Sequence, residues 1–149
     1  MRTDLGILAT EVLQIYRRRL ESRSVDAHLV VEGDVFATVM AVEIKQVVAN
    51  LLGNAMDATD ELGRAGITVR GLASEVVITV SDTGHGIREQ DSRRVFKSFF
   101  TTRKDVGTGL GLWVSKGIVE KHLGEISFQS CPSPPNRCTT FTVRLKKDI

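Results

Sequence analysis

The stretch "ANLLGNAMDATDE", residues 49–61, has the apolar spacing of a helix interior, yet it carries two asparagines four residues apart. Asparagine is a poor helix former because its side chain competes for backbone hydrogen bonds. The apolar spacing on both sides of this stretch predicts a helix from about Ala41 to Leu62. A function is therefore needed that explains why Asn50, Asn54 and Asp57 follow one another along it.

Two faces separate on this helix when successive residues are placed about 100° apart. A broad apolar arc should lie on a sheet, and it contains Ile44, Val47, Val48, Leu51, Ala55 and Leu62. A narrow polar stripe without Lys or Arg contains Glu43, Gln46, Asn50, Asn54, Asp57 and Glu61. A solvated face is the ordinary interpretation of such a stripe. An oxygen-rich stripe also suits Mg²⁺ when substrate phosphates supply the other ligands, and the helix alone does not decide.

The segment "SDTGHGI", residues 81–87, continues an alternating apolar run that predicts a strand. Asp82 shares the strand face of the apolar residues, so its carboxylate should point toward the buried side. A buried carboxylate needs hydrogen-bond donors, and the amino group of adenine is a suitable one. Gly84 and Gly86 would let the backbone turn tightly and approach a ring. An ordinary Asp-Thr-Gly turn is the alternative.

The segment "DVGTGLGL", residues 105–112, opens a further helix. Gly107, Gly109 and Gly111 would let backbone N–H groups converge on phosphate at the helix N-terminus. The spacing is neither that of a Walker A loop nor that of a Rossmann fingerprint. Taken alone, this loop is therefore a weak indication of nucleotide binding.

A region with little strand pattern separates these two segments, and it contains "VFKSFFTTRK", residues 95–104. Long loops of this kind commonly serve as lids, and we predict a lid over residues 88–106. Arg103 and Lys104 could meet phosphate charge. Three phenylalanines would anchor the lid: Phe96, Phe99 and Phe100.

The remaining segments complete one α+β domain spanning residues 1–149. Helical spacing covers residues 3–21 and 110–122, and two short strands flank residues 32–34. Paired strands are predicted at residues 67–73 with 75–82 and at residues 124–131 with 138–145. The pattern favours helices laid on one face of a largely antiparallel sheet.

Composition excludes several function classes. The 149 residues carry a net charge of +2 and 5% aromatic residues, which gives no case for nucleic acid. No apolar run approaches the roughly 20 residues needed to span a bilayer, and the N-terminus lacks a signal-peptide pattern. Cys131 and Cys138 flank a "PSPPN" turn, and reduced thiols are favoured over a disulfide or zinc pair there. We expect a cytoplasmic protein.

Four segments together resemble a known family. "QVVANLLGNAMDA", "DTGHGI", "VFKSFFTTR" and "GTGLGL" resemble the N, G1, F and G2 boxes of the ATP-binding catalytic (HATPase_c) domain of bacterial sensor histidine kinases, in the GHKL superfamily. The resemblance runs from about Leu5 to Leu145. It implies the Bergerat fold, a two-layer α/β sandwich with a mixed, largely antiparallel sheet and about three helices on one face. At Leu123 a second glycine is common in the family, and we expect only the helix exit to change.

The resemblance also implies the site residues. It makes Asn54 the Mg²⁺ ligand, and it makes Asn50 and Arg103 the catalytic positions, facing the phosphates. It makes Asp82 the partner of the adenine amino group, supported by a Thr139 hydroxyl. The implied nucleotide-binding residues are Asn50, Asn54, Asp57, Asp82, Gly84, Gly86, Ile87, Thr102, Arg103, Lys104, Gly107, Thr108, Gly109, Leu110, Gly111, Leu112 and Thr139.

The implied activity is that of a protein-histidine kinase catalytic domain. It would bind Mg–ATP and pass the γ-phosphate to a histidine on a separate phosphoacceptor hairpin, with a response regulator downstream. His28, His85 and His122 lack an H-box context, so the chain should not phosphorylate itself. The isolated domain should be monomeric, without contact to a membrane or nucleic acid, although the parent kinase could be membrane-anchored.

Three other functions are open at this point. One is a GHKL ATPase, but those relatives use a glutamate where this chain has Asn50, and an amide cannot act as a general base. The others are an anti-sigma-type serine kinase and a non-catalytic nucleotide-binding module.

Overall fold

The computed structural model describes residues 1–59, 63–84, 96, 111–131 and 138–148. Within these residues the elements in chain order are β1 (Arg2–Asp4), α1 (Leu5–Ser22), β2 (Asp26–Glu32), β3 (Phe36–Thr38), α2 (Ala41–Ala58), β4 (Arg64–Gly71), β5 (Glu75–Asp82), α3 (Gly111–Lys121), β6 (Glu125–Cys131) and β7 (Cys138–Lys146). In this part of the chain, no helix is both long and apolar enough to cross a membrane.

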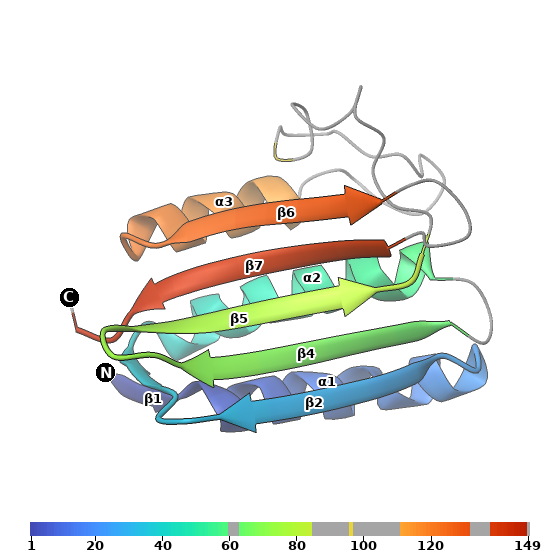
Figure 1. The fold of residues 1–149 in the computed structure, drawn as a ribbon, viewed down its shortest axis with the longest axis horizontal. Helices are drawn as coiled ribbons and strands as arrows, with labels where there is room; N and C mark the ends of the chain where they lie inside the picture. Colours follow the sequence, from blue (N-terminus) through green and yellow to red (C-terminus); the bar gives the residue numbers. More distant parts are fainter. Residues whose placement is uncertain (60–62, 85–95, 97–110, 132–137, 149) are drawn as a thin grey trace.

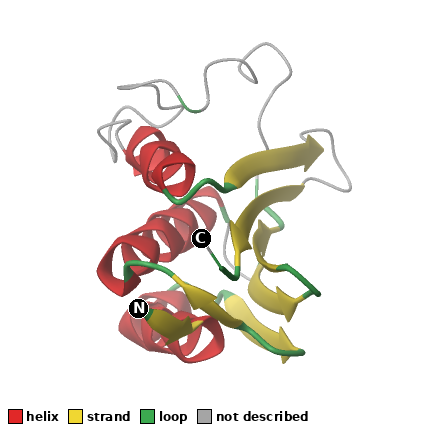
Figure 2. Ribbon diagram, turned by 90° about the vertical axis from the view of Figure 1, so that its left-hand side faces the viewer, coloured by secondary structure: helices red, strands yellow, loops and turns green. Residues whose placement is uncertain are grey.

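The main sheet has five strands in the order β2-β4-β5-β7-β6 (Figure 1). β2 pairs with β4 in parallel, and the other three pairings are antiparallel. The described helices all lie on one face of the sheet (Figure 2). The predicted α+β class and two-layer arrangement are therefore confirmed, as are both predicted strand pairs. The two strands predicted around residues 32–34 also form, but β3 pairs with β1 in a small separate sheet.

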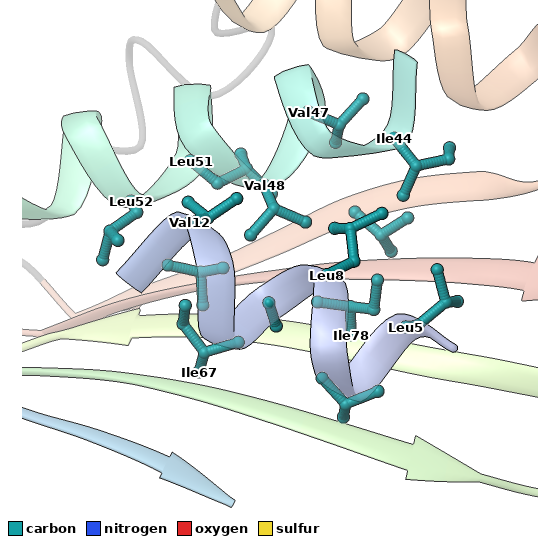
Figure 3. Close-up of a cluster of buried hydrophobic side chains, with 14 of the residues drawn as sticks. Leu5, Leu8, Val12, Ile44, Val47, Val48, Leu51, Leu52, Ile67 and Ile78 are labelled. Atoms are coloured by element: carbon teal, nitrogen blue, oxygen red, sulfur yellow. The ribbon is translucent and has the colours of Figure 1, made fainter. Parts of the chain in front are cut away.

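The core lies between α1, α2 and the sheet. Figure 3 shows Leu8 and Val12 of α1 meeting Val48 of α2 above Ile67 and Ile78 of the sheet. Each such fully buried side chain stabilises the fold by about 1.5–3 kcal/mol. The predicted apolar arc of α2 is buried at all five of its described positions: Ile44, Val47, Val48, Leu51 and Ala55.

The ends of two helices differ from the predicted ends. α1 begins at Leu5 rather than residue 3, because Asp4 is its N-cap and accepts hydrogen bonds from the backbone N–H groups of Gly6 and Ile7. α2 ends at Ala58, before the predicted Leu62, because the backbone of Thr59 is extended. The Thr59 hydroxyl instead donates back to the carbonyl of Ala55 at 2.6 Å. Residues 60–62 lie outside the described part of the chain.

Two residues at the C-terminal end of α3 contact the start of α2. The buried imidazole of His122 accepts a hydrogen bond at Nε2 from Met40 N–H and donates at Nδ1 to the carbonyl of Ile118, at 3.1 and 2.8 Å. Met40 is the N-cap of α2 and has no side-chain cap of its own. The ammonium of Lys121 adds a 2.9 Å ion pair with Glu43. His122 is therefore structural. Leu123 follows with a φ of 59°, the left-handed conformation that glycine adopts more readily.

Candidate functional site

The described site residues gather at one end of the sandwich. α2 and β5 end there, and α3 and β7 begin there, on the right-hand side of Figure 1. The described members of the predicted set are Asn50, Asn54, Asp57, Asp82, Gly84, Gly111, Leu112 and Thr139. Outside the described residues lie Gly86, Ile87, Thr102, Arg103, Lys104, Gly107, Thr108, Gly109 and Leu110, and all of the predicted lid 88–106 except Phe96.

Asp82 is a buried carboxylate at the last position of β5. Its side chain belongs to the core-facing row of the strand, as predicted, and the residue is only 6% exposed. Its Oδ1 accepts a hydrogen bond of 2.8 Å from the backbone N–H of Gly84. An ionised carboxylate can accept several hydrogen bonds, and a buried carboxylate needs donors for its oxygens. The position suits recognition of a ligand group that donates hydrogen bonds.

Thr139 lies directly opposite Asp82, because the two are Cα partners in the β5–β7 register. Thr139 is buried, and its hydroxyl is 3.3 Å from the hydroxyl of Ser130 on β6. Thr139 is among the site residues that the family resemblance implies, whereas Ser130 is not. The β6–β7 register pairs Ser130 with Thr139, and that pairing is the signal that could have revealed it.

Gly84 presses against the end of α2. A Cβ built on Gly84 would lie 2.2 Å from the carbonyl oxygen and 2.5 Å from the carbonyl carbon of Ala58. Real side chains do not make such contacts with backbone, so this approach requires glycine. The turn that carries Asp82 is thereby held against α2, which carries both asparagines.

Asn50 connects α2 to the start of α3. Its Nδ2 donates hydrogen bonds of 3.2 Å to the carbonyl oxygen of Gly111 and of 3.2 Å to the hydroxyl of Ser115. Ser115 is completely buried and was not among the predicted site residues. Asn54, one turn further along α2, is exposed and has no hydrogen-bond partner within the described part of the chain.

Two acidic residues of the polar stripe on α2 form ion pairs with residues at the ends of neighbouring helices. Glu43 pairs with Lys121, the last residue of α3, and Asp57 is 3.9 Å from the guanidinium of Arg23 at the end of α1. Arg23 also donates to the carbonyl oxygen of Thr59 at 3.0 Å. The stripe itself has no cation, but α1 and α3 supply them. Asn54 lies between these two ion pairs and is exposed.

The donor set fits Mg²⁺ held mainly by phosphate oxygens. Among the described residues, no cluster of three or more His, Cys, Asp or Glu side chains could hold a metal by itself. Mg²⁺ usually keeps several waters and needs only one or two protein oxygens when substrate phosphates complete its shell. The exposed amide oxygen of Asn54 meets that requirement.

Phe96 and Leu112 are partly buried and pack against the core. The Phe96 ring packs edge-on against Phe128 and Phe141, with centroid distances of 6.0 and 6.1 Å. Leu112 is half-buried against the core. The predicted anchoring role fits Phe96, whereas Phe99 and Phe100 lie outside the described residues.

Known proteins are similar to this chain in sequence and in fold. The family described as "Histidine kinase-, DNA gyrase B-, and HSP90-like ATPase" matches residues 40–149. The adaptive-response sensory kinase SasA of Rippkaea orientalis is 32% identical over 145 residues, which are 93% of this chain and 37% of SasA. The signal transduction histidine-protein kinase BarA of Escherichia coli is 31% identical over 151 residues, 93% of this chain and 16% of BarA. The chain thus spans well under half the length of these curated relatives.

Solved structures agree with the sequence relatives. The nucleotide-free catalytic domain of histidine kinase ThkA has a TM-score of 0.89 at 28% identity, covering 100% of this chain and 98% of that chain. The mycobacterial sensor histidine kinase MprB has a TM-score of 0.89 at 24% identity, covering 99% of each chain, and supports the fold alone. The chain belongs to the histidine kinase-, DNA gyrase B- and HSP90-like ATPase family and has the architecture of a histidine kinase catalytic domain.

Proposed function

We propose that this chain binds Mg–ATP and donates the γ-phosphate to a histidine on a separate phosphoacceptor hairpin, in a two-component signalling system. The observation that carries the proposal is the buried Asp82 carboxylate beside Gly84, at the point where α2 ends and α3 begins. The names of the relatives support it, and one solved structure is a complex of ThkA with the response regulator TrrA. We extend the proposal to a response regulator as the downstream partner.

Adenine recognition would rest on Asp82. A carboxylate accepts hydrogen bonds, and the amino group of adenine donates them, whereas guanine offers a carbonyl oxygen at the same ring position. The hydroxyls of Thr139 and Ser130 lie on the neighbouring strands and would support this contact. Gly84 would hold the turn that carries Asp82 close against the end of α2.

Triphosphate binding would use α2 and the start of α3. Asn54 would hold Mg²⁺, which neutralises phosphate charge when bound. The glycine-rich segment 107–110 precedes α3, which begins at Gly111, so its backbone N–H groups would bind phosphate at the start of that helix. Positioning and charge neutralisation carry most of phosphoryl transfer, so a domain without its own nucleophile is chemically sensible. Arg103, Lys104, Thr102 and the loop Gly107–Leu110 stay part of this proposal as the residues that would surround the phosphates.

An ATPase is the second function to test. Asn50 offers no general base, and in this structure its N–H groups are directed to Gly111 and Ser115. This observation favours phosphotransfer over efficient hydrolysis. We also propose that the domain is monomeric and cytoplasmic, without contact to a membrane or nucleic acid.

The chain incubated alone with labelled ATP and Mg²⁺ should acquire no acid-labile label and should release phosphate slowly. Adding its cognate histidine hairpin should give labelled hairpin, because the acceptor would then reach the γ-phosphate. Acid-labile label on this chain by itself would overturn the proposal that the acceptor histidine lies on a separate hairpin. Brisk phosphate release that Asn50→Ala abolishes would favour the ATPase instead.

Asn54→Ala should reduce affinity for Mg–ATP by about tenfold, and it should reduce affinity for metal-free ATP much less, since an amide ligand acts through the metal. Titration calorimetry in Mg²⁺ and in EDTA measures both values. Gln46→Ala is the matched control, because Gln46 is exposed on the same polar stripe two turns earlier. Equal losses with and without Mg²⁺ would mean that Asn54 touches nucleotide without holding metal.

A further inference from the structure

Ser115 is a buried polar residue in the interface between α3 and α2. It lies on the face of α3 that packs against the rest of the fold, one turn before the buried Ile118 and Val119. Its side chain is completely buried, with 0% exposure. A buried hydroxyl costs free energy unless it is hydrogen-bonded, and the contact that the structure shows for Ser115 is with Asn50 on α2.

The hydrogen bonds fix which way the Asn50 amide faces. The carbonyl oxygen of Gly111 can only accept, so the amide group 3.2 Å from it must be the nitrogen, Nδ2. Nδ2 has two hydrogens, and the Ser115 hydroxyl takes the second one, also at 3.2 Å. The oxygen Oδ1 is then left as the group available to a ligand, and it has no partner within the described residues.

We propose that Ser115 is a positioning residue for the nucleotide site. Together with the Gly111 carbonyl it holds the Asn50 amide with both N–H groups on α3, which keeps Oδ1 available to a magnesium ion or to the water molecules bound to that ion. Reversing the amide would place an oxygen against the Gly111 carbonyl and would present donors to a cation. This inference rests on the proposed Mg–ATP binding, but the side-chain orientation that it specifies exists without nucleotide.

The first test is made on the nucleotide-free protein by nuclear magnetic resonance. The two side-chain amide protons of Asn50 should be resolved and slow to exchange in the wild type, because both are hydrogen-bonded inside the α2–α3 interface. In Ser115→Ala one acceptor is lost, so one proton should shift and its exchange should accelerate by about threefold to tenfold, the size expected for one hydrogen bond. If the Asn50 side-chain amide protons have the same chemical shifts and exchange rates in wild type and variant, the proposal is overturned, whether or not the protein binds ATP.

The second test measures the gain in ATP affinity that Mg²⁺ provides. Ser115→Ala should reduce that gain by about threefold to tenfold, while metal-free ATP binding changes less. In an Asn50→Ala background the same substitution should have no further effect on the gain, because Ser115 acts through Asn50. Additive losses in this double-mutant cycle would overturn the positioning role.

Controls separate this inference from the proposed function. Thr10→Ala removes a hydroxyl that donates a hydrogen bond to the carbonyl of Gly6 within α1, and it should leave the Mg²⁺ gain unchanged. A wild-type chain that binds no ATP would refute the proposed function, and the resonance experiment would still decide the orientation of Asn50.

Discussion

Replacing Asp82 by asparagine should weaken ATP binding by about a hundredfold or more and leave the fold intact. The substitution keeps the shape of the side chain, and the asparagine oxygen can still accept the 2.8 Å hydrogen bond from Gly84. The amide nitrogen would then occupy the place of Oδ2. A donor would face the adenine amino group, which is also a donor, at a buried position where a mismatch of this kind is costly.

Titration calorimetry of both proteins with ATP measures this effect, and thermal unfolding shows whether the fold is kept. Glu75→Gln is the matched control, because Glu75 is a carboxylate at the opposite end of the same strand, paired with Arg144. The control should bind ATP as the wild type does. Equal ATP affinities for wild type and Asp82→Asn would remove Asp82 from the site.

Local patterns predicted much of the fold and part of the site. The alternation before Asp82 and the helical period around Asn50 each depend on neighbours in sequence, and both faces are buried as predicted. The antiparallel pairs β4–β5 and β6–β7 are also sequence neighbours, so their alternation and turns were sufficient to identify them. These are contacts for which the chain itself limits the alternatives.

Contacts between distant segments could not be predicted in the same way. Ser115 and Asn50 are 65 residues apart, and a serine on a helix face resembles many others until α3 is placed against α2. The contacts of Arg23 with Asp57 and Thr59 could not be predicted either, because they require the ends of α1 and α2 to meet. The polar stripe of α2 contains no Lys or Arg. The positive charges that pair with it belong to Arg23 and Lys121, which meet the stripe only when α1 and α3 pack against α2.

The end of α2 was misjudged for a related reason. The apolar period continues to Leu62, but the helix ends at Ala58, where Gly84 from the turn after β5 lies against the last turn. The spacing of apolar residues within α2 cannot indicate that the turn containing Gly84 lies against the end of the helix. The same contact gives the second large prediction.

Gly84→Ala should destabilise the protein by about 1–3 kcal/mol and weaken ATP binding as well. The new Cβ would lie 2.2 Å from the Ala58 carbonyl oxygen, and neither partner is the flexible end of a side chain. Backbone must therefore move, either at the end of α2 or in the turn after Asp82. Movement of the turn would displace the carboxylate from the base, so one methyl group should reduce both stability and affinity.

Gly117→Ala makes the sharpest control for Gly84→Ala. Gly117 is exposed within α3, and a Cβ there would meet nothing within 4 Å. Alanine is the better helix former, so this substitution should stabilise the protein by roughly 0.5–1 kcal/mol and leave ATP binding unchanged. Urea unfolding with ATP titration on both variants gives two effects of opposite sign from the same chemical change. A Gly84→Ala protein as stable as the wild type would show that the turn after β5 does not depend on its close approach to α2, and Asp82 would then need another explanation for its position.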